Sequence, residues 1–119
     1  MCDAFTAGDE DFCYLTTRGR VTGRAHEIEI WFARDHDTLY LLAGGGERSD
    51  WVRNVRAQPA VTVRVGAATG AARARVVEDG TSEDGLARRL VFEKYQPRGG
   101  GDLRGWRDTA VVVAIDVQS

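Results

Sequence analysis

The chain has 119 residues, of which 43% are hydrophobic and 29% charged, and its formal net charge is -2. These values are typical of a single globular domain with a modest core. They argue against a general nucleic-acid-binding protein, which is normally strongly basic. No apolar run is long enough to span a membrane. Among the lysine and arginine residues, all except Lys94 are arginine, whose planar guanidinium suits contacts with carboxylates and phosphates; genomic base composition is the alternative reason for their number.

The N-terminal residues and the cysteines set the expected compartment. Residues 1–11 place acidic side chains among small ones, which predicts a loose segment before one domain over 12–119. Cys2 and Cys13 have neither metal-ligand nor CxxC spacing, so we expect no metal site and no disulfide. With no apparent signal peptide and no disulfide framework, we expect a cytoplasmic protein.

Three strands are predicted in the first part of the domain. Residues 12–17 are rich in β-forming side chains and predict the first strand, which leads into a turn over 19–24 that holds two glycines. Residues 26–33 alternate apolar and polar side chains, as a half-buried antiparallel strand does. Residues 39–43 predict the third strand, after a polar hairpin turn.

A short helix and two more strands follow. The glycines at 44–46 end the third strand, and Ser49 is a good N-cap for a helix over 50–56. Valine alternates with polar residues over 61–65, and small apolar residues alternate with arginine over 72–77. Both patterns predict half-buried strands.

The last part of the chain predicts a second helix and a final strand. Ser82, followed by two acidic residues, caps a helix that carries Tyr95 on its apolar face, and the glycines at 99–101 follow as a flexible loop. Residues 111–117 alternate as a strand. The predicted fold is therefore mainly β, with six short strands and two short helices. Hairpin-length turns favour an antiparallel sheet that closes into a small barrel or half-barrel.

The turn after the first strand is the best candidate for an anion site. It combines three arginines with two glycines, which allow close approach of the backbone, and a hydroxyl donor. A solvated surface hairpin is the alternative. The candidate cofactor-binding residues here are Arg18, Gly19, Arg20, Thr22, Gly23 and Arg24.

The start of the helix over 50–56 is the second candidate region. Free N–H groups at a helix N-terminus attract anions, and Arg48 and Ser49 lie beside it. Trp51 could form a wall against a flat ring or belong to the core. Asn54 could bind a cofactor or cap a loop, and His26 could hydrogen-bond a cofactor or hold the turn.

Two segments carry a family resemblance. Residues 15–24 read Leu-Thr-Thr-Arg-Gly-Arg-Val-Thr-Gly-Arg, and residues 51–63 begin Trp-Val-Arg-Asn-Val-Arg. Together, in this order, they resemble the deazaflavin-dependent nitroreductases over about residues 12–117. The resemblance implies a six-stranded antiparallel split β-barrel of the type shared by proteins that bind flavin mononucleotide (FMN). It also implies a homodimer that binds coenzyme F-420.

The resemblance further implies the reaction, a hydride transfer from reduced coenzyme F-420 to a small organic acceptor such as a quinone, a nitroaromatic or an enone. Ala25 replaces a proline common in the family, and its tyrosine-rich C-terminal region is represented only by Tyr95 and Trp106. Tyr95 is the candidate catalytic proton donor, with packing on the core as the alternative. Two other functions stay open: an FMN-dependent oxidoreductase and a non-catalytic deazaflavin carrier.

Overall fold

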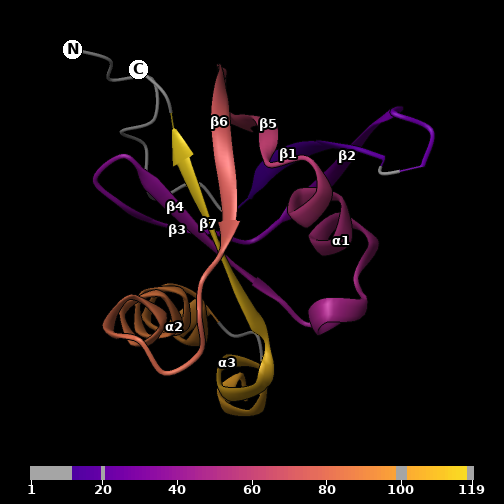
Figure 1. The fold of residues 1–119 in the computed structure, drawn as a ribbon. Helices are drawn as coiled ribbons and strands as arrows, with labels where there is room; N and C mark the ends of the chain where they lie inside the picture. Colours follow the sequence, from indigo (N-terminus) through magenta and orange to yellow (C-terminus); the bar gives the residue numbers. More distant parts are fainter. Residues whose placement is uncertain (1–11, 20, 99–101, 118–119) are drawn as a thin grey trace.

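The computed structural model describes residues 12–19, 21–98 and 102–117. Cys2, the acidic segment 1–11, Arg20 and the loop over 99–101 lie outside them. Within the described residues, one antiparallel sheet has the strand order β2-β1-β5-β6-β7-β4-β3, and it curls into a half-barrel (Figure 1). The strands are β1 (Cys13–Arg18), β2 (Ala25–Ile30), β3 (Ala33–Asp35), β4 (Thr38–Ala43), β5 (Ala60–Val65), β6 (Ala68–Val76) and β7 (Val111–Val117).

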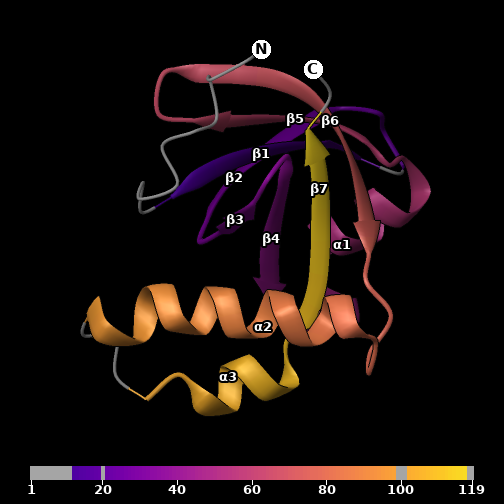
Figure 2. The same ribbon diagram turned by 90° about the vertical axis from the view of Figure 1, so that its left-hand side faces the viewer.

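Two of the helices pack against strands of this sheet, one mainly against β1 and β6 and the other mainly against β3 and β4. The two predicted helices are confirmed between β4 and β5 and between β6 and β7. Thr81 rather than Ser82 is the N-cap of α2, because its hydroxyl oxygen accepts a hydrogen bond from the Asp84 N–H at 3.1 Å. A further helix, α3, lies beneath α2 (Figure 2). The helices are η1 (Gly46–Arg48), α1 (Asp50–Ala57), α2 (Ser82–Tyr95), η2 (Gln96–Arg98) and α3 (Arg104–Thr109).

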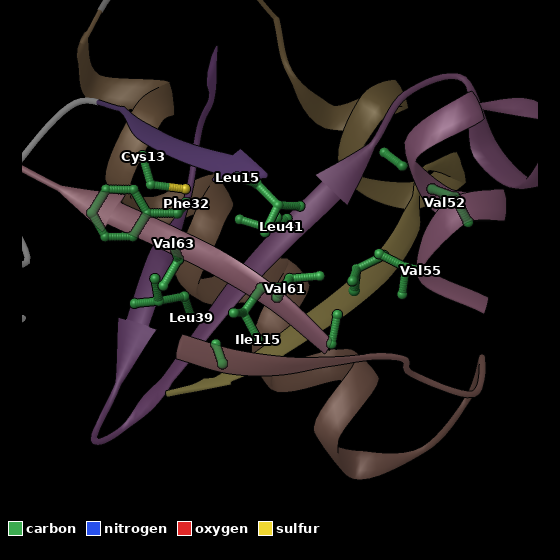
Figure 3. Close-up of a cluster of buried hydrophobic side chains, with 14 of the residues drawn as sticks. Cys13, Leu15, Phe32, Leu39, Leu41, Val52, Val55, Val61, Val63 and Ile115 are labelled. Carbon is green, nitrogen blue, oxygen red and sulfur yellow. The ribbon is translucent and has the colours of Figure 1, made fainter. Parts of the chain in front are cut away.

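The first core fills the inside of the half-barrel (Figure 3). Val61, Val63 and Val65 point inward from β5 as their alternation predicts, and α1 closes one end with Val52 and Val55. Cys13 is fully buried in the same core. Burial raises the pKa of its thiol to about 12, so this cysteine remains a protonated core residue.

A second core lies between α2 and the opposite face of β4 and β7. Tyr40 and Leu42 of β4 pack here against Ala87, Val91 and Tyr95 of α2. Figure 2 shows α2 crossing this part of the sheet. Each of these strands is therefore covered on both faces, which explains the continuous apolar run of β4.

The prediction of one strand over 26–33 is wrong in one respect: the structure has two strands, β2 and β3, which are separated by Trp31 and Phe32. β2 pairs with β1 at one edge of the sheet, and β3 pairs with β4 at the other. At the division, the Phe32 N–H donates to the Tyr95 hydroxyl at 3.0 Å. The Phe32 carbonyl accepts from that hydroxyl at 3.0 Å and from Lys94 Nζ at 2.9 Å. Side chains of α2 thus replace the hydrogen bonds of a strand ladder.

An arginine on β6 ties α2 to the sheet. The guanidinium of Arg75 binds both carboxylate oxygens of Glu83 at 2.6 and 2.7 Å and Asp116 Oδ2 at 2.7 Å. The Tyr40 hydroxyl donates to Glu83 at 2.8 Å, and the Thr38 hydroxyl donates to Asp116 at 2.9 Å. Hydrogen bonds from Arg75 lower the pKa of both carboxyl groups below their ordinary values.

This network predicts an acid-dependent stability. Because the pKa values of Glu83 and Asp116 are lower in the folded state, the unfolded chain binds more protons as the pH falls. We expect the urea midpoint of unfolding to decrease between about pH 5 and pH 2, and to decrease less in Arg75→Met. Arg73→Met, on the exposed face of the same strand, is the matched control. An equal acid sensitivity of Arg75→Met and Arg73→Met would contradict the prediction.

Candidate functional site

A cavity of about 550 Å³ lies between the β1–β2 turn, β2 and the first turns of α1. Figure 1 shows the turn and α1 on the same side of the sheet. We call it the turn cavity. Its lining residues are Thr17, Gly19, Val21, Thr22, Arg24, His26, Glu27, Ile28, Asp50, Trp51 and Asn54.

Hydrogen bonds within the turn fix its shape. The Gly19 N–H donates to the Arg24 carbonyl at 2.8 Å, and the Gly23 N–H donates to the Gly19 carbonyl at 2.9 Å. The Thr22 hydroxyl oxygen accepts from the Arg24 N–H at 3.3 Å, and Arg18 donates to the Gly23 carbonyl at 3.2 Å. Gly23 has a φ of 75°, a conformation that favours glycine. Arg18 therefore supports the turn from outside the cavity.

Gly19 packs closely against His26. A Cβ atom at Gly19 would lie 3.2 Å from His26 Nε2 and 3.3 Å from Thr22 Oγ1. His26 is opposite Thr17 in the β1–β2 register, so its imidazole reaches back over the start of the turn. The imidazole and the Thr22 hydroxyl thus converge at one end of the turn cavity.

The other side of the turn cavity belongs to α1. Asn54 and Thr17 are buried, and the Asn54 side-chain N–H donates to the Thr17 hydroxyl oxygen at 3.3 Å. This bond joins α1 to β1 directly behind the cavity. Trp51 is half-buried, and it packs against the first core while also lining the cavity.

The structure brings together only part of the predicted set. Four predicted residues that the structure describes do not line the turn cavity: Arg18, Gly23, Arg48 and Ser49. Arg20 is not among the described residues. Sequence reasoning missed five lining residues, although Val21 carried a signal as a lone apolar side chain in a polar turn. Val21 is 88% exposed. The predicted residues that line the cavity are Gly19, Thr22, Arg24, His26, Trp51 and Asn54, and the missed ones are Thr17, Val21, Glu27, Ile28 and Asp50.

The turn cavity has mixed charge. Arg24 supplies a permanent cation, whereas Glu27 and Asp50 supply carboxylates. Val21, Ile28 and Trp51 add apolar surface, so the cavity suits a ligand with both a flat apolar part and a charged part. Within the described residues, no group of three or more histidine, cysteine, aspartate or glutamate side chains could hold a metal ion.

Tyr95 does not line the turn cavity. Its side chain is 2% exposed, and its hydroxyl bonds to the backbone of Phe32. The ring of Tyr95 stacks on Trp31, with centroids 4.2 Å apart and an interplanar angle of 4°. Of the two roles considered for Tyr95, proton donor or core residue, this geometry corresponds to the core residue.

A second cavity, of about 400 Å³, lies farther along β2. Trp106 meets Trp31 edge-on there, with ring centroids 5.6 Å apart. Ile28 lines the turn cavity and Ile30 lines the second one; they share one face of β2, about 6–7 Å apart. We call the second cavity the aromatic cavity; its lining residues are Phe12, Glu29, Ile30, Trp31, Leu42, Leu103 and Trp106.

Comparison with solved structures shows the same fold. The chain is similar to F420-H2 Dependent Reductase (FDR-A), at 23% identity over 91% of this chain and 94% of the other, with a TM-score of 0.71. It is also similar to a conserved hypothetical protein from Mycobacterium tuberculosis, at 20% identity over 100% of this chain and 82% of the other, with a TM-score of 0.76. A third similar structure, of a protein described as a domain-swapped dimer, is 24% identical over 91% of this chain and 80% of the other, with a TM-score of 0.70.

Sequence comparison gives a more specific result. No curated protein sequence matches the chain significantly, and none of the helices in the described residues has the length and hydropathy needed to cross a membrane. The family model for F420H(2)-dependent quinone reductase matches residues 5–115, nearly the whole chain. The chain therefore belongs to the F420H(2)-dependent quinone reductase family and is an oxidoreductase that uses coenzyme F-420.

Proposed function

We propose that this protein passes a hydride from reduced coenzyme F-420 to a flat, apolar acceptor such as a quinone, a nitroaromatic or an enone. The observation that carries the proposal is that residues of one strand, β2, line both a mixed polar cavity and an aromatic cavity. When bound, the coenzyme supplies the hydride, and the protein contributes binding and orientation.

The residues of the turn cavity fit a ligand with a flat ring and an anionic tail. The guanidinium of Arg24 and the hydroxyl of Thr22 offer charge and hydrogen bonds to the tail, and Trp51 with Ile28 offers an apolar wall to the ring. A volume of about 550 Å³ is within the range of small-ligand sites. The carboxylate of Asp50 opposes an anion at the start of α1, so we place the tail at the Arg24 end.

The aromatic cavity is the proposed acceptor site. Two indoles and several aliphatic side chains line it, and such surfaces bind flat apolar rings by stacking and burial. Hydride transfer needs reacting atoms about 3–3.5 Å apart. Ile28 of the turn cavity and Ile30 of the aromatic cavity are neighbours on one face of β2, and we place the reacting edges of the two rings there.

The experiment is a titration of the purified protein with oxidised coenzyme F-420 and, separately, with FMN, each followed by ligand fluorescence. We expect a clear preference for coenzyme F-420, and oxidation of its reduced form when menadione, a naphthoquinone, is added. Preference for FMN would instead support the FMN-dependent alternative. Tight stoichiometric binding without turnover of menadione, a nitroaromatic or an enone would support a carrier.

We also propose that the protein is a homodimer. The similar fold of a protein described as a domain-swapped dimer supports this assembly, as do the exposed apolar side chains of Phe12 and Val21. Light scattering on the titration samples gives the mass directly, and a mass near 13.1 kDa, that of one chain, would contradict a dimer.

A further inference from the structure

We propose that Tyr95 is a positioning residue that acts through Trp31, whose indole it holds in place as a wall of the aromatic cavity. The inference rests on the proposed function, because it takes the aromatic cavity as the acceptor site. It gives Tyr95 a role in acceptor binding without contact between its hydroxyl and the reacting atoms.

The backbone at Trp31 needs an external support. Trp31 and Phe32 lie between β2 and β3 and belong to neither strand, so the strand ladders on both sides stop short of them. The hydroxyl of Tyr95 bonds both the N–H and the carbonyl of Phe32, and Lys94 bonds the same carbonyl. The end of α2 therefore sets the direction in which the chain leaves β2, and with it the direction of the Trp31 side chain.

The ring of Tyr95 sets the plane of the indole. The two rings are nearly parallel, with an interplanar angle of 4°, whereas Trp106 meets the indole at 86°. Tyr95 is itself immobilised within the second core, beside Val91 and Ala87. Trp31 thus has one face against a fixed ring and a T-shaped contact with a second indole, which restricts its rotamer.

Two substitutions separate the contributions of the hydroxyl and the ring. Tyr95→Phe keeps the stacked ring and loses the bonds to Phe32, whereas Tyr95→Leu loses both. Tyr40→Phe is the matched control, because Tyr40 is a buried tyrosine of the same second core whose hydroxyl bonds Glu83 instead. All three variants remove the hydroxyl of a buried tyrosine, so a general loss of stability is common to them.

The first readout needs no ligand. We expect the indole N–H resonance of Trp31, assigned with Trp31→Phe, to shift in Tyr95→Leu, because the ring current of the stacked tyrosine is lost. The shift should be smaller in Tyr95→Phe, which keeps the stacked ring and loses the bonds to Phe32, and the resonance should remain in place in Tyr40→Phe. All spectra are recorded at a temperature where circular dichroism shows each variant folded.

The second readout is kinetic, with reduced coenzyme F-420 and menadione. In Tyr95→Leu we expect the KM for menadione to rise about tenfold, with a smaller rise in Tyr95→Phe and none in Tyr40→Phe. The dissociation constant of oxidised coenzyme F-420 should be unchanged in all three, because the turn cavity is intact.

The outcomes separate this inference from the proposed function. If Tyr95→Leu matches Tyr40→Phe in both the Trp31 resonance and the KM, the positioning role is refuted while the reductase function stands. If the wild-type protein does not reduce menadione and menadione does not perturb the Trp31 resonance, the aromatic cavity is not the acceptor site, and the role in acceptor binding is overturned with it.

Discussion

Replacing Arg88 with alanine should lower the free energy of unfolding by about 3–5 kcal/mol. The Arg88 side chain is 15% exposed and that of Asp84 is 8% exposed. Arg88 Nε lies 3.0 and 3.1 Å from the two carboxylate oxygens of Asp84, and its terminal nitrogen donates to the Arg107 carbonyl at 2.5 Å. Without the guanidinium, the bond that remains to the buried carboxylate of Asp84 among the described residues is that from the Gly80 N–H at 3.3 Å. The hydrogen bond from α2 to the Arg107 carbonyl of α3 is lost as well.

Urea unfolding followed by circular dichroism measures this effect. Arg89→Ala is the matched control, because Arg89 is the next residue of α2 and forms an exposed pair with Glu93 at 3.7 Å, worth about 0–1 kcal/mol. The double variant Asp84→Leu, Arg88→Met should recover much of the loss, since it removes both buried charges. A loss for Arg88→Ala no larger than that for Arg89→Ala would show that the buried pair is not important for stability.

Replacing Arg24 with alanine should weaken binding of coenzyme F-420 by about 10–100-fold, as expected for the loss of a hydrogen bond to a charged group. Arg24 is an exposed cation on the wall of the turn cavity, and we place the anionic tail beside it. Because exposed charges are screened by salt, the effect should be largest at low ionic strength. The double variant Arg20→Ala, Arg24→Ala should lose more.

Fluorescence titration at two salt concentrations tests this prediction. The control is Arg53→Ala, which removes an exposed arginine of α1 that is not among the residues lining the turn cavity, and should change the dissociation constant little. If the affinity of Arg24→Ala at low salt equals that of the wild-type protein, the interpretation of the turn as an anion site is wrong.

Much of the fold could be predicted because the strands are short, regular and half-buried. The alternation of Val61, Val63 and Val65 determines which face is buried. The division of the strand over 26–33 could not be predicted, because the period-two pattern continues from Ile30 to Phe32 across it. What stops the strand is the hydroxyl of Tyr95, a partner 63 residues away in the sequence.

The site was predictable only where it is local in the sequence. Gly19, Thr22, Arg24 and His26 belong to one turn and its following strand, so their proximity follows from the chain itself. The aromatic cavity depends on long-range packing of β2, β4 and α3, which a local pattern such as the alternation over 26–33 does not indicate. Arg88 and Arg89 are adjacent in the sequence and chemically identical, yet Arg88 is the one that pairs with a buried aspartate one helical turn earlier, while Arg89 is exposed.

The two cavities share one strand, and this restricts the lengths that β2 can have. His26 and Trp31 are separated by a single stretch of extended backbone, so inserting one residue between them would turn every following side chain to the opposite face. Inserting two residues would return the side chains to their original face. It would also move the two cavities about 6–7 Å farther apart along the strand, which is too far for hydride transfer between bound rings. Functional variants of this segment should therefore differ by substitution and not by insertion or deletion.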